Sequence, residues 1–575
     1  MTAPIGPPIG GPVRRFYTEP VTEIFPTLQI ASSVPRKEDG SIGRSSGMMA
    51  IANLVSRITG FLRQIVLFAV LGATVLNDSY TVSNTLPNIV YEFLIGGVLS
   101  SVMIPLLVRA QNEDADGGER YTRRLFTLAG AALLVATALS MLAAPLLTSL
   151  YVSPSGNREL ATAFAYLLLP QILFYGLGAL MGALLNTKGS FGAFAWAPVL
   201  NNIVVLGVLG VYLAVPGEIS LDPVRMGDAK LLVLGLGTTL GIVAQTVVLL
   251  PAMRRSGFRF RPVWGWDPRM SATGGLALWA IAYVLIGAIG LNVTTQVATA
   301  ADGGSYVVYA NSWLLLQVPY GVLGVSLLTA LMPRMSRAAA EGRTSAVLDD
   351  LSLGSRLSIV FLLPLAALFT AFGPAIGVAL FGLRSSGIEG AQQIGLALAC
   401  SAFGLVPYAI TLLQLRVFYA LTDSRTPALI QLFTVLVKVP LLLLCPALLP
   451  PEEVVLGLVA ANGLSFVAGA VVGQVLLRRR LGSVRSAEVA STGWRTLVAA
   501  GVAAAVARGA VLLAGPMNAV SPLAGAWIQV VLGCIVWLPL TVVGLRLLQV
   551  AELEPVTRRL AGLAGRFKPR RGGDR

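Results

Sequence analysis

Residues 48–71 read MMAIANLVSRITGFLRQIVLFAVL, an apolar run that nevertheless carries Arg57 and Arg63 well away from either end. About twenty apolar residues suffice for a helix to cross the hydrocarbon core of a bilayer. A charged side chain at the bilayer centre costs about 2.5–3.5 kcal/mol, so two arginines oppose insertion by about 5–7 kcal/mol. Such residues persist where they face a wet cavity and bind a ligand, and guanidinium groups favour an anion.

Similar apolar runs recur as far as residue 549, and the chain is 55% hydrophobic but only 12% charged. Soluble globular proteins carry about 25% charged residues. We therefore predict an all-α, polytopic membrane protein with about fourteen transmembrane helices. The predicted spans are 48–71, 79–107, 125–150, 160–185, 192–214, 231–253, 273–300, 305–332, 357–381, 391–420, 427–449, 453–477, 494–514 and 521–549.

Lys and Arg residues are distributed very unequally between the two predicted sides of the membrane. With the N-terminus placed in the cytoplasm, 32 lie on the cytoplasmic side, four lie outside, and six lie within spans. This positive-inside pattern predicts that both termini are cytoplasmic. It also explains the net charge of +15 without nucleic acid as a partner, and it places the basic tails near anionic membrane lipids.

Proline-centred patterns recur about 230 residues apart. Pro170 precedes Asn186 by sixteen residues, as Pro407 precedes Asp423, and LPNIVYEFLIGGVLSSVMIP resembles QVPYGVLGVSLLTALMP. An offset of six helices predicts two parallel six-helix lobes around a central cavity, although Pro and Gly are also common in unrelated membrane helices. The predicted parts are a disordered cytoplasmic leader (1–46), an N-lobe (47–256), a C-lobe (257–481), two additional helices (482–549) and a basic cytoplasmic tail (550–575).

The composition favours a carrier over an enzyme. The chain has no histidine, which removes His-based catalysis and His-ligated metals, and it has no GxxxxGK[ST] motif for nucleotide phosphates. Its three cysteines fall within apolar spans, where cysteine acts as a small hydrophobe. We predict no cofactor and no metal site.

Polar residues gather on one side of the first predicted helix. At 100° per residue, a wedge of about 120° holds six of them: Asn53, Ser56, Arg57, Gly60, Arg63 and Gln64. The opposite side is apolar, which predicts one lipid face and one wet face. We expect Gly60 to leave room beside the guanidinium groups and to serve, with Pro87, as a hinge.

The second helix carries a continuous polar stripe with spacings of 3, 4, 3 and 4. Its members are Asp78, Thr81, Thr85, Asn88 and Glu92, flanked by Asn84 and Tyr91. One alternative is a buried Arg–Asp pair that only holds the two helices together. A single aspartate cannot neutralise two arginines about 9 Å apart along the axis, so we predict a net positive cavity suited to phosphate.

The assembled motifs resemble the MurJ (MviN) family of lipid II flippases, within the superfamily of multidrug and polysaccharide exporters. The resemblance covers residues 47–549. Its most specific segments are SRITGFLRQIVLFAVLG (56–72), NDSYTVSNTLPNIV (77–90), GALLNTKGSFGAFAWAPVLNN (182–202), VPYGVLGVSLLTALMPRMSR (318–337) and RVFYALTDSRTP (416–427).

The resemblance implies a carrier that moves lipid II, an undecaprenyl-pyrophosphate-linked disaccharide-pentapeptide, between the leaflets of the bacterial plasma membrane. Transport is from the inner to the outer leaflet, by alternating access. It also implies that Arg57, Arg63 and Asp78 are needed for function, that Pro87 and Asn88 belong to a functional segment, and that the last two helices form a groove for the lipid tail.

The chain departs from well-studied members of that family. Well-studied members have a further arginine shortly after the LPN segment, at the position of Tyr91, which is followed here by Glu92. In the predicted span 305–332, Leu314 and Gln317 stand in place of an arginine and a glutamate. The resemblance still assigns Gln317 to the cavity. Lys438 lies inside the predicted span 427–449, in a region where some relatives bind sodium. Its ammonium group either replaces a coupling cation or reaches toward the membrane–water interface.

Arg416 and Asp423 lie near the cytoplasmic end of the predicted span 391–420. They are predicted either to form a gate there or to make a local helix-capping arrangement. Two other functions stay open: a flippase for a different polyprenyl-pyrophosphate-linked glycan, and a non-transporting membrane scaffold for cell-wall synthesis. Cell-wall synthesis or division proteins are the expected protein partners.

Overall fold

The computed structural model describes residues 39–93, 104–267, 274–383, 387–515 and 521–553. The secondary structure of these residues is helical, with no strand. Twelve of the helices are long and apolar enough to cross a membrane. The chain is thus a multi-pass helical membrane protein, as predicted, while the count of fourteen spans stays a prediction.

The described residues before position 256 form ten helices. They are α1 (Asp39–Leu71), α2 (Val75–Phe93), α3 (Ile104–Glu113), α4 (Glu119–Leu142), α5 (Ala144–Tyr151), α6 (Arg158–Leu168), α7 (Gln171–Thr187), α8 (Gly192–Ala214), α9 (Ala229–Val247) and α10 (Leu250–Arg255).

The second half of the chain repeats this all-helical pattern. Its helices are α11 (Gly274–Ala300), α12 (Ser305–Pro319), η3 (Tyr320–Gly324), α13 (Val325–Ala340), α14 (Thr344–Phe381), α15 (Ile388–Ser401), η5 (Ala402–Gly404), α16 (Leu405–Ala420), α17 (Arg425–Leu448), η6 (Pro451–Glu453), α18 (Val454–Leu481), α19 (Ser486–Leu513), α20 (Pro522–Leu547) and η7 (Ala551–Leu553).

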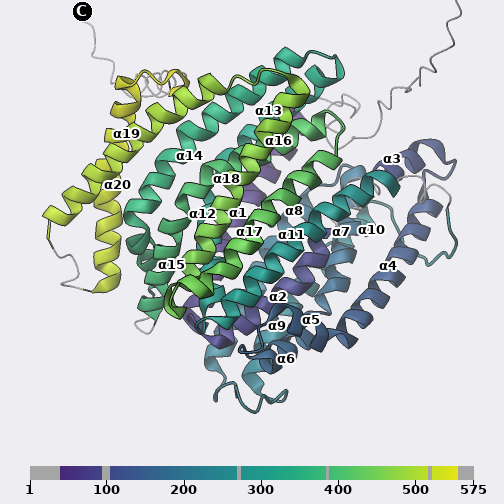
Figure 1. The fold of residues 1–575 in the computed structure, drawn as a ribbon. Helices are drawn as coiled ribbons and strands as arrows, with labels where there is room; N and C mark the ends of the chain where they lie inside the picture. Colours follow the sequence, from purple (N-terminus) through teal and green to yellow (C-terminus); the bar gives the residue numbers. More distant parts are fainter. Residues whose placement is uncertain (1–38, 94–103, 268–273, 384–386, 516–520, 554–575) are drawn as a thin grey trace, which may run out of the picture.

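Most helix packing occurs within each half of the chain. In the first half α8 packs along α1 and α9, and in the second α17 packs along α11 and α18. Helices α19 and α20 lie together at one edge of the molecule, against α14 (Figure 1). This arrangement is compatible with two lobes and an added pair of helices, but the predicted lobe boundaries and the repeat stay predictions.

Several predicted spans are built from interrupted helices. Span 160–185 breaks between α6 and α7, next to Pro170, and span 391–420 breaks at η5, three residues before Pro407. Span 305–332 contains the π-helix η3 between α12 and α13. Proline removes a backbone donor, and π-helical turns are frequent at functional sites, so these breaks mark positions where helix geometry changes.

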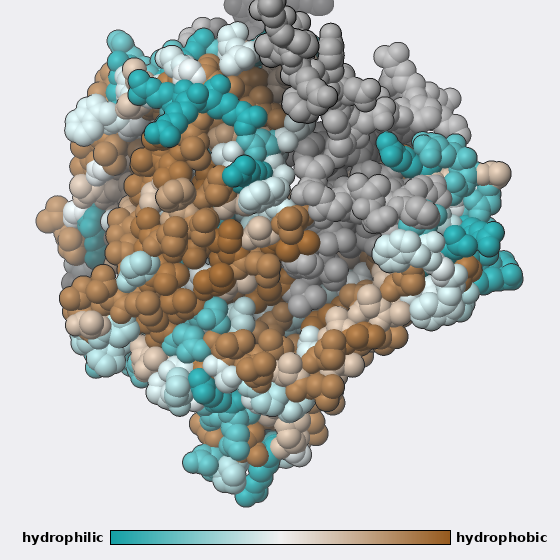
Figure 2. Space-filling view, turned by 45° about the vertical axis from the view of Figure 1, so that its right-hand side comes forward, coloured by the Kyte–Doolittle hydropathy of each residue, from teal (hydrophilic) through white to brown (hydrophobic). Residues whose placement is uncertain are grey.

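The outer surface carries a broad apolar region between two more polar ends (Figure 2). Exposed leucine, valine and isoleucine side chains on the long helices supply it, among them Leu139 at 60%, Leu443 at 59% and Ile535 at 61% exposed. An apolar surface of this extent needs an apolar environment, which is lipid for a helical bundle with this composition.

Candidate functional site

Asp78 connects the two halves of the chain at the end predicted to lie outside. Its carboxylate accepts hydrogen bonds from the backbone N–H groups of Gly304 and Val307, both at 2.8 Å. These donors belong to the first turn of α12, whose N-terminal N–H groups have no partner within the helix. The Asp78 carboxylate of α2 therefore caps a helix whose N-cap residue, Gly304, stands 226 residues further along the chain.

Gly304 permits this close approach. Its φ is 97°, in the left-handed region that favours glycine, and a Cβ at this position would collide with the backbone of Ala73. The segment before α2 and the start of α12 are thus in direct backbone contact. Near the same end, the ring of Phe381 at the end of α14 packs edge-on against Phe68 of α1, at 5.4 Å between centroids.

We call this region of contact between the two halves the seam. At a second helix end in the seam, side chains of the second half cap a helix of the first half. The Asn292 side chain of α11 donates to the carbonyl of Leu150 at 2.6 Å, and the Gln296 side chain donates to the carbonyl of Ser149 at 3.1 Å. Both carbonyls lie in the last turn of α5. Each half of the chain therefore supplies side chains that satisfy an exposed helix end of the other half.

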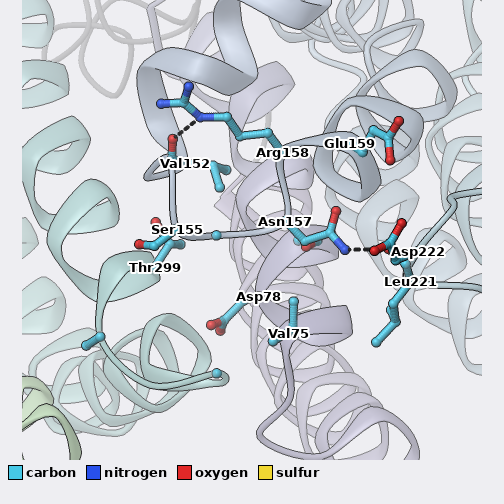
Figure 3. Close-up of a pocket in the computed structure, with 14 residues that line it drawn as sticks. Val75, Asp78, Val152, Ser155, Asn157, Arg158, Glu159, Leu221, Asp222 and Thr299 are labelled. Atoms are coloured by element: carbon cyan, nitrogen blue, oxygen red, sulfur yellow. Dashed lines mark hydrogen bonds between the residues drawn. The ribbon is translucent and has the colours of Figure 1, made fainter.

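A cavity of about 460 Å³ lies beside this seam (Figure 3). Its walls come from loops of both halves, and Asp78 lies among the lining residues. Arg158 donates to the Val152 carbonyl and Asn157 donates to the Leu221 carbonyl, both at 2.9 Å. Arg158 thus stabilises the loop before α6, and the cavity opens at the end of the molecule that is predicted to lie outside.

The two edges of the polar wedge of α1 contact different helices. The Asn202 side chain of α8 donates to the Ser56 carbonyl at 3.2 Å and to the Thr59 hydroxyl at 3.0 Å. A Cβ on Gly60 would lie 3.3 Å from the same Asn202 amide nitrogen. The expectation that Gly60 leaves room beside the guanidinium groups is therefore wrong: that edge of the wedge is occupied by α8.

Arg57 lies at the other edge of the wedge and is exposed, as is Asn53. Its guanidinium rests on the backbone of η3, since a Cβ built on Gly321 would collide with Arg57 Nη1. The side chain thus bridges the first helix of one half and the π-helical turn of the other. Arg57 pairs with no carboxylate among the residues that the structure describes.

Arg63 is half-buried and lies close enough to Tyr80 of α2 for an electrostatic interaction. Within the described part of the chain it also forms no ion pair, and neither does Asp78. A buried Arg–Asp pair between helices 1 and 2, the alternative from the sequence, is therefore not formed. Gln64, one residue on, is half-buried.

The polar stripe of α2 is only partly exposed. Asn88 is exposed, whereas Asn84 is half-buried, and its Oδ1 lacks a hydrogen-bond partner among the described residues. The helix continues through Pro87 to Phe93. The side chain of Glu92 lies outside the described residues. On α12, Gln317 is half-buried and lies one helical turn before Gly321, on the same side of the helix.

Arg416 and Asp423 do not contact each other as the gate hypothesis requires. Arg416 is exposed, whereas Asp423 forms an ion pair with Arg480 of α18. Asp423 also accepts hydrogen bonds from the backbone N–H groups of Arg425 and Thr426, both at 3.0 Å, at the start of α17. The capping alternative is the one that the structure contains.

The electrostatic environment of Asp423 fits this capping role. Partial burial by itself raises the pKa of the carboxyl group, but hydrogen bonds from Thr426 and the nearby Arg480 guanidinium outweigh it. The pKa therefore lies below its ordinary value of 3.8. Asp423 is charged at neutral pH and stabilises the first turn of α17.

Lys438 is half-buried in the middle of α17 and lies against α11, where a Cβ on Gly290 would be 3.8 Å from its Cδ. Among the described residues it forms no ion pair. No group of three or more potential metal ligands of the Cys, Asp and Glu type was found in the described part of the chain.

Several important residues were missed at the level of sequence: Asn202, Asn292, Gln296, Gly304 and Gly321. Asn202 stands in the quoted segment 182–202, and two amide side chains one turn apart on α11 are a recognisable polar pair. The two glycines gave no such signal, because each is required by close contact with a residue from a distant part of the chain.

Comparison with known proteins gives a consistent result. The profile of the family described as "Lipid II flippase MurJ" matches residues 67–524. A probable lipid II flippase MurJ of Rhizobium meliloti is 28% identical over 426 residues, which cover 71% of this chain and 77% of that protein. A probable lipid II flippase MurJ of Vibrio cholerae is 24% identical over 400 residues, which cover 67% and 74%.

Two solved structures share the fold. A lipid II flippase MurJ in an inward closed conformation superposes with a TM-score of 0.67 at 17% identity, over 87% of this chain and 98% of that one. An inward-facing multidrug resistance transporter of the MATE family superposes with a TM-score of 0.59 at 15% identity, over 76% and 99%.

Proposed function

This chain belongs to the lipid II flippase MurJ family, and from that premise we propose that it carries lipid II from the inner to the outer leaflet of a bacterial plasma membrane. Transport by alternating access needs a binding site that is exposed to one side at a time. Both tails are on the cytoplasmic side in this proposal, as the distribution of Lys and Arg predicts.

The observation that carries the proposal is the state of the two arginines on α1. Both are far from the helix ends, and neither is neutralised by a carboxylate within the described residues. Two unpaired guanidinium groups in a membrane span are costly unless an anion binds there. Each phosphate group of a pyrophosphate presents two oxygens that can accept two parallel hydrogen bonds from one guanidinium group.

The capped helix ends at the outer seam support a state that is closed to the outside. In this state the headgroup enters from the cytoplasmic leaflet, the pyrophosphate binds at Arg57 and Arg63, and the polyprenyl tail stays in lipid. Opening to the outside requires that Asp78 leave the first turn of α12 and that Asn292 and Gln296 leave the last turn of α5. We assign these three residues to an outer gate.

Lys438 lies between α11 and α17. We propose that its ammonium group takes the place of a coupling cation, because it lies half-buried against Gly290 of α11, inside a predicted span. Transport by the wild-type protein should then proceed without sodium. A strict sodium requirement in liposomes would contradict this part of the proposal.

The experiment is translocation of lipid II by the purified full-length protein in liposomes, with Arg57→Ala and Arg63→Ala variants. Both variants should insert normally but lose most of the transport activity. Arg254→Ala, in the last turn of α10, is the matched control and should keep it. Full transport by both α1 variants would overturn the site assignment, and no transport by the wild type would overturn the function.

A further inference from the structure

Four aromatic side chains from α12, η3, α16 and α18 form one continuous cluster. Trp313 is stacked on Phe466 with an interplanar angle of 22° at 5.4 Å, and Tyr408 meets Trp313 edge-on at 5.2 Å. Tyr408 also contacts Phe466 at 4.9 Å and Tyr320 at 5.1 Å. Each of the four side chains is only half-buried, so part of the cluster surface stays accessible.

The cluster points toward the interior of its bundle. Phe466 lies about 160° around α18 from Leu464 and about 140° from Val471. Leu464 and Val471 are 46% and 57% exposed on the outside of this helix. The accessible edges of the aromatic rings therefore face away from the surface that contacts lipid.

The cluster lies next to the position of Arg57. Tyr320 is the first residue of η3, and the following residue, Gly321, supports the Arg57 guanidinium. Arg416 is also close enough to Tyr320 to interact electrostatically. An anion held by Arg57 would thus lie beside an aromatic surface that belongs to the other half of the chain.

We infer that Trp313, Tyr320, Tyr408 and Phe466 form a stacking surface for a sugar ring of the substrate. This inference rests on the proposed function, and it identifies the part of the site that recognises the glycan. The disaccharide is joined directly to the pyrophosphate, so a phosphate at Arg57 places the first sugar within reach of the cluster. The apolar face of a pyranose matches the weakly negative face of an aromatic ring.

Pure core packing accounts less well for the same residues. Tyr408 and Tyr320 bring hydroxyl groups to an aromatic contact that phenylalanine would make equally well, and phenol groups at a site commonly serve to orient a polar ligand. The π-helical turn at Tyr320–Gly324 also widens the helix where the aromatic cluster and Arg57 meet, and such turns recur at functional sites.

The test compares two ligands on the full-length protein: polyprenyl pyrophosphate with the disaccharide and polyprenyl pyrophosphate without it. Trp313→Leu keeps an apolar side chain but removes the aromatic face. Its Kd for the sugar-bearing lipid should rise about three- to tenfold. Its Kd for the bare pyrophosphate should stay within about twofold, since the stacking surface does not contact phosphate.

Phe466→Leu should show the same selective loss and decides the question if Trp313→Leu fails to fold. Trp264→Leu, a 69% exposed tryptophan in the segment after α10, is the matched control and should change neither Kd. Equal weakening of both ligands, or no change in either, would overturn the inference. Failure of the wild type to bind either lipid would instead overturn the proposed function, together with this inference.

Discussion

The Asp78 carboxylate and the Val307 backbone N–H lie 2.8 Å apart and join α2 to the first turn of α12. A carboxylate at a helix N-terminus is stabilised both by the unpaired N–H groups and by the helix dipole. The residue that the sequence predicted to face a phosphate-binding cavity is therefore bound to a helix end. In the proposed mechanism, Asp78 contributes to transport by holding the outer gate closed.

Asp78→Ala should shift the protein toward the outward-open state. Loss of a helix N-cap costs about 0.5–2 kcal/mol, which corresponds to about a two- to thirtyfold change in the equilibrium. The readout is the rate at which an impermeant maleimide labels a cysteine placed at Ser79, which lines the cavity but is buried in this state, after the three native cysteines have been replaced. Glu159→Ala, in the same cavity, should leave the rate unchanged.

Asn292→Asp should open the gate further than Asn292→Leu. Leucine only removes the donor to the Leu150 carbonyl, whereas aspartate also places a negative charge at the negative end of α5. We expect about a tenfold difference in the same labelling rate, equivalent to about 1.4 kcal/mol. Equal rates for the two variants would show that Asn292 does not act on the helix end.

Gly321→Ala should impair lipid II transport by displacing the Arg57 guanidinium, with which the new Cβ would collide. We expect about a tenfold loss, and no further loss when Gly321→Ala is added to Arg57→Ala, because both changes remove the same contact. Gly207→Ala on α8, where a Cβ meets nothing within 4 Å, is the control. Additive effects would separate Gly321 from Arg57.

Asn202→Ala should destabilise the protein by about 1–3 kcal/mol, because it removes the amide that donates to the Ser56 carbonyl and the Thr59 hydroxyl. Thermal unfolding in detergent measures the change. Asn201→Ala is the neighbouring control: the Asn201 Oδ1 has no hydrogen-bond partner among the described residues, so its removal should cost less. A larger loss for Asn201→Ala would contradict the assigned role of Asn202.

Asp423→Asn should lower stability at neutral pH and lose this effect in acid. The folded-state pKa lies below 3.8, so the charged carboxylate stabilises the fold above its unfolded pKa, and this contribution disappears as pH falls through the folded pKa. The unfolding temperatures of wild type and variant should therefore converge below pH 3.8. Glu341→Gln, which breaks an exposed ion pair with Arg343, should show little effect at any pH.

The sequence by itself determined the membrane setting, the helical class and the family. Hydropathy over about twenty residues and the sidedness of Lys and Arg depend only on local composition, and the five quoted motifs depend only on order along the chain. The net positive charge of the first two helices also followed from the sequence, because one aspartate cannot neutralise two arginines about 9 Å apart along the helix axis.

Only the tertiary structure decided what each polar residue faces. Helical periodicity fixes the angle of Gly60, Arg57 or Asp78 around its own helix axis, but not the neighbour that occupies that direction. Those neighbours, Asn202, Gly321 and the first turn of α12, come from segments more than 140 residues away. Packing of whole helices places these neighbours, so Asp78, which lines the small cavity between the two halves, also caps a helix from a distant part of the chain.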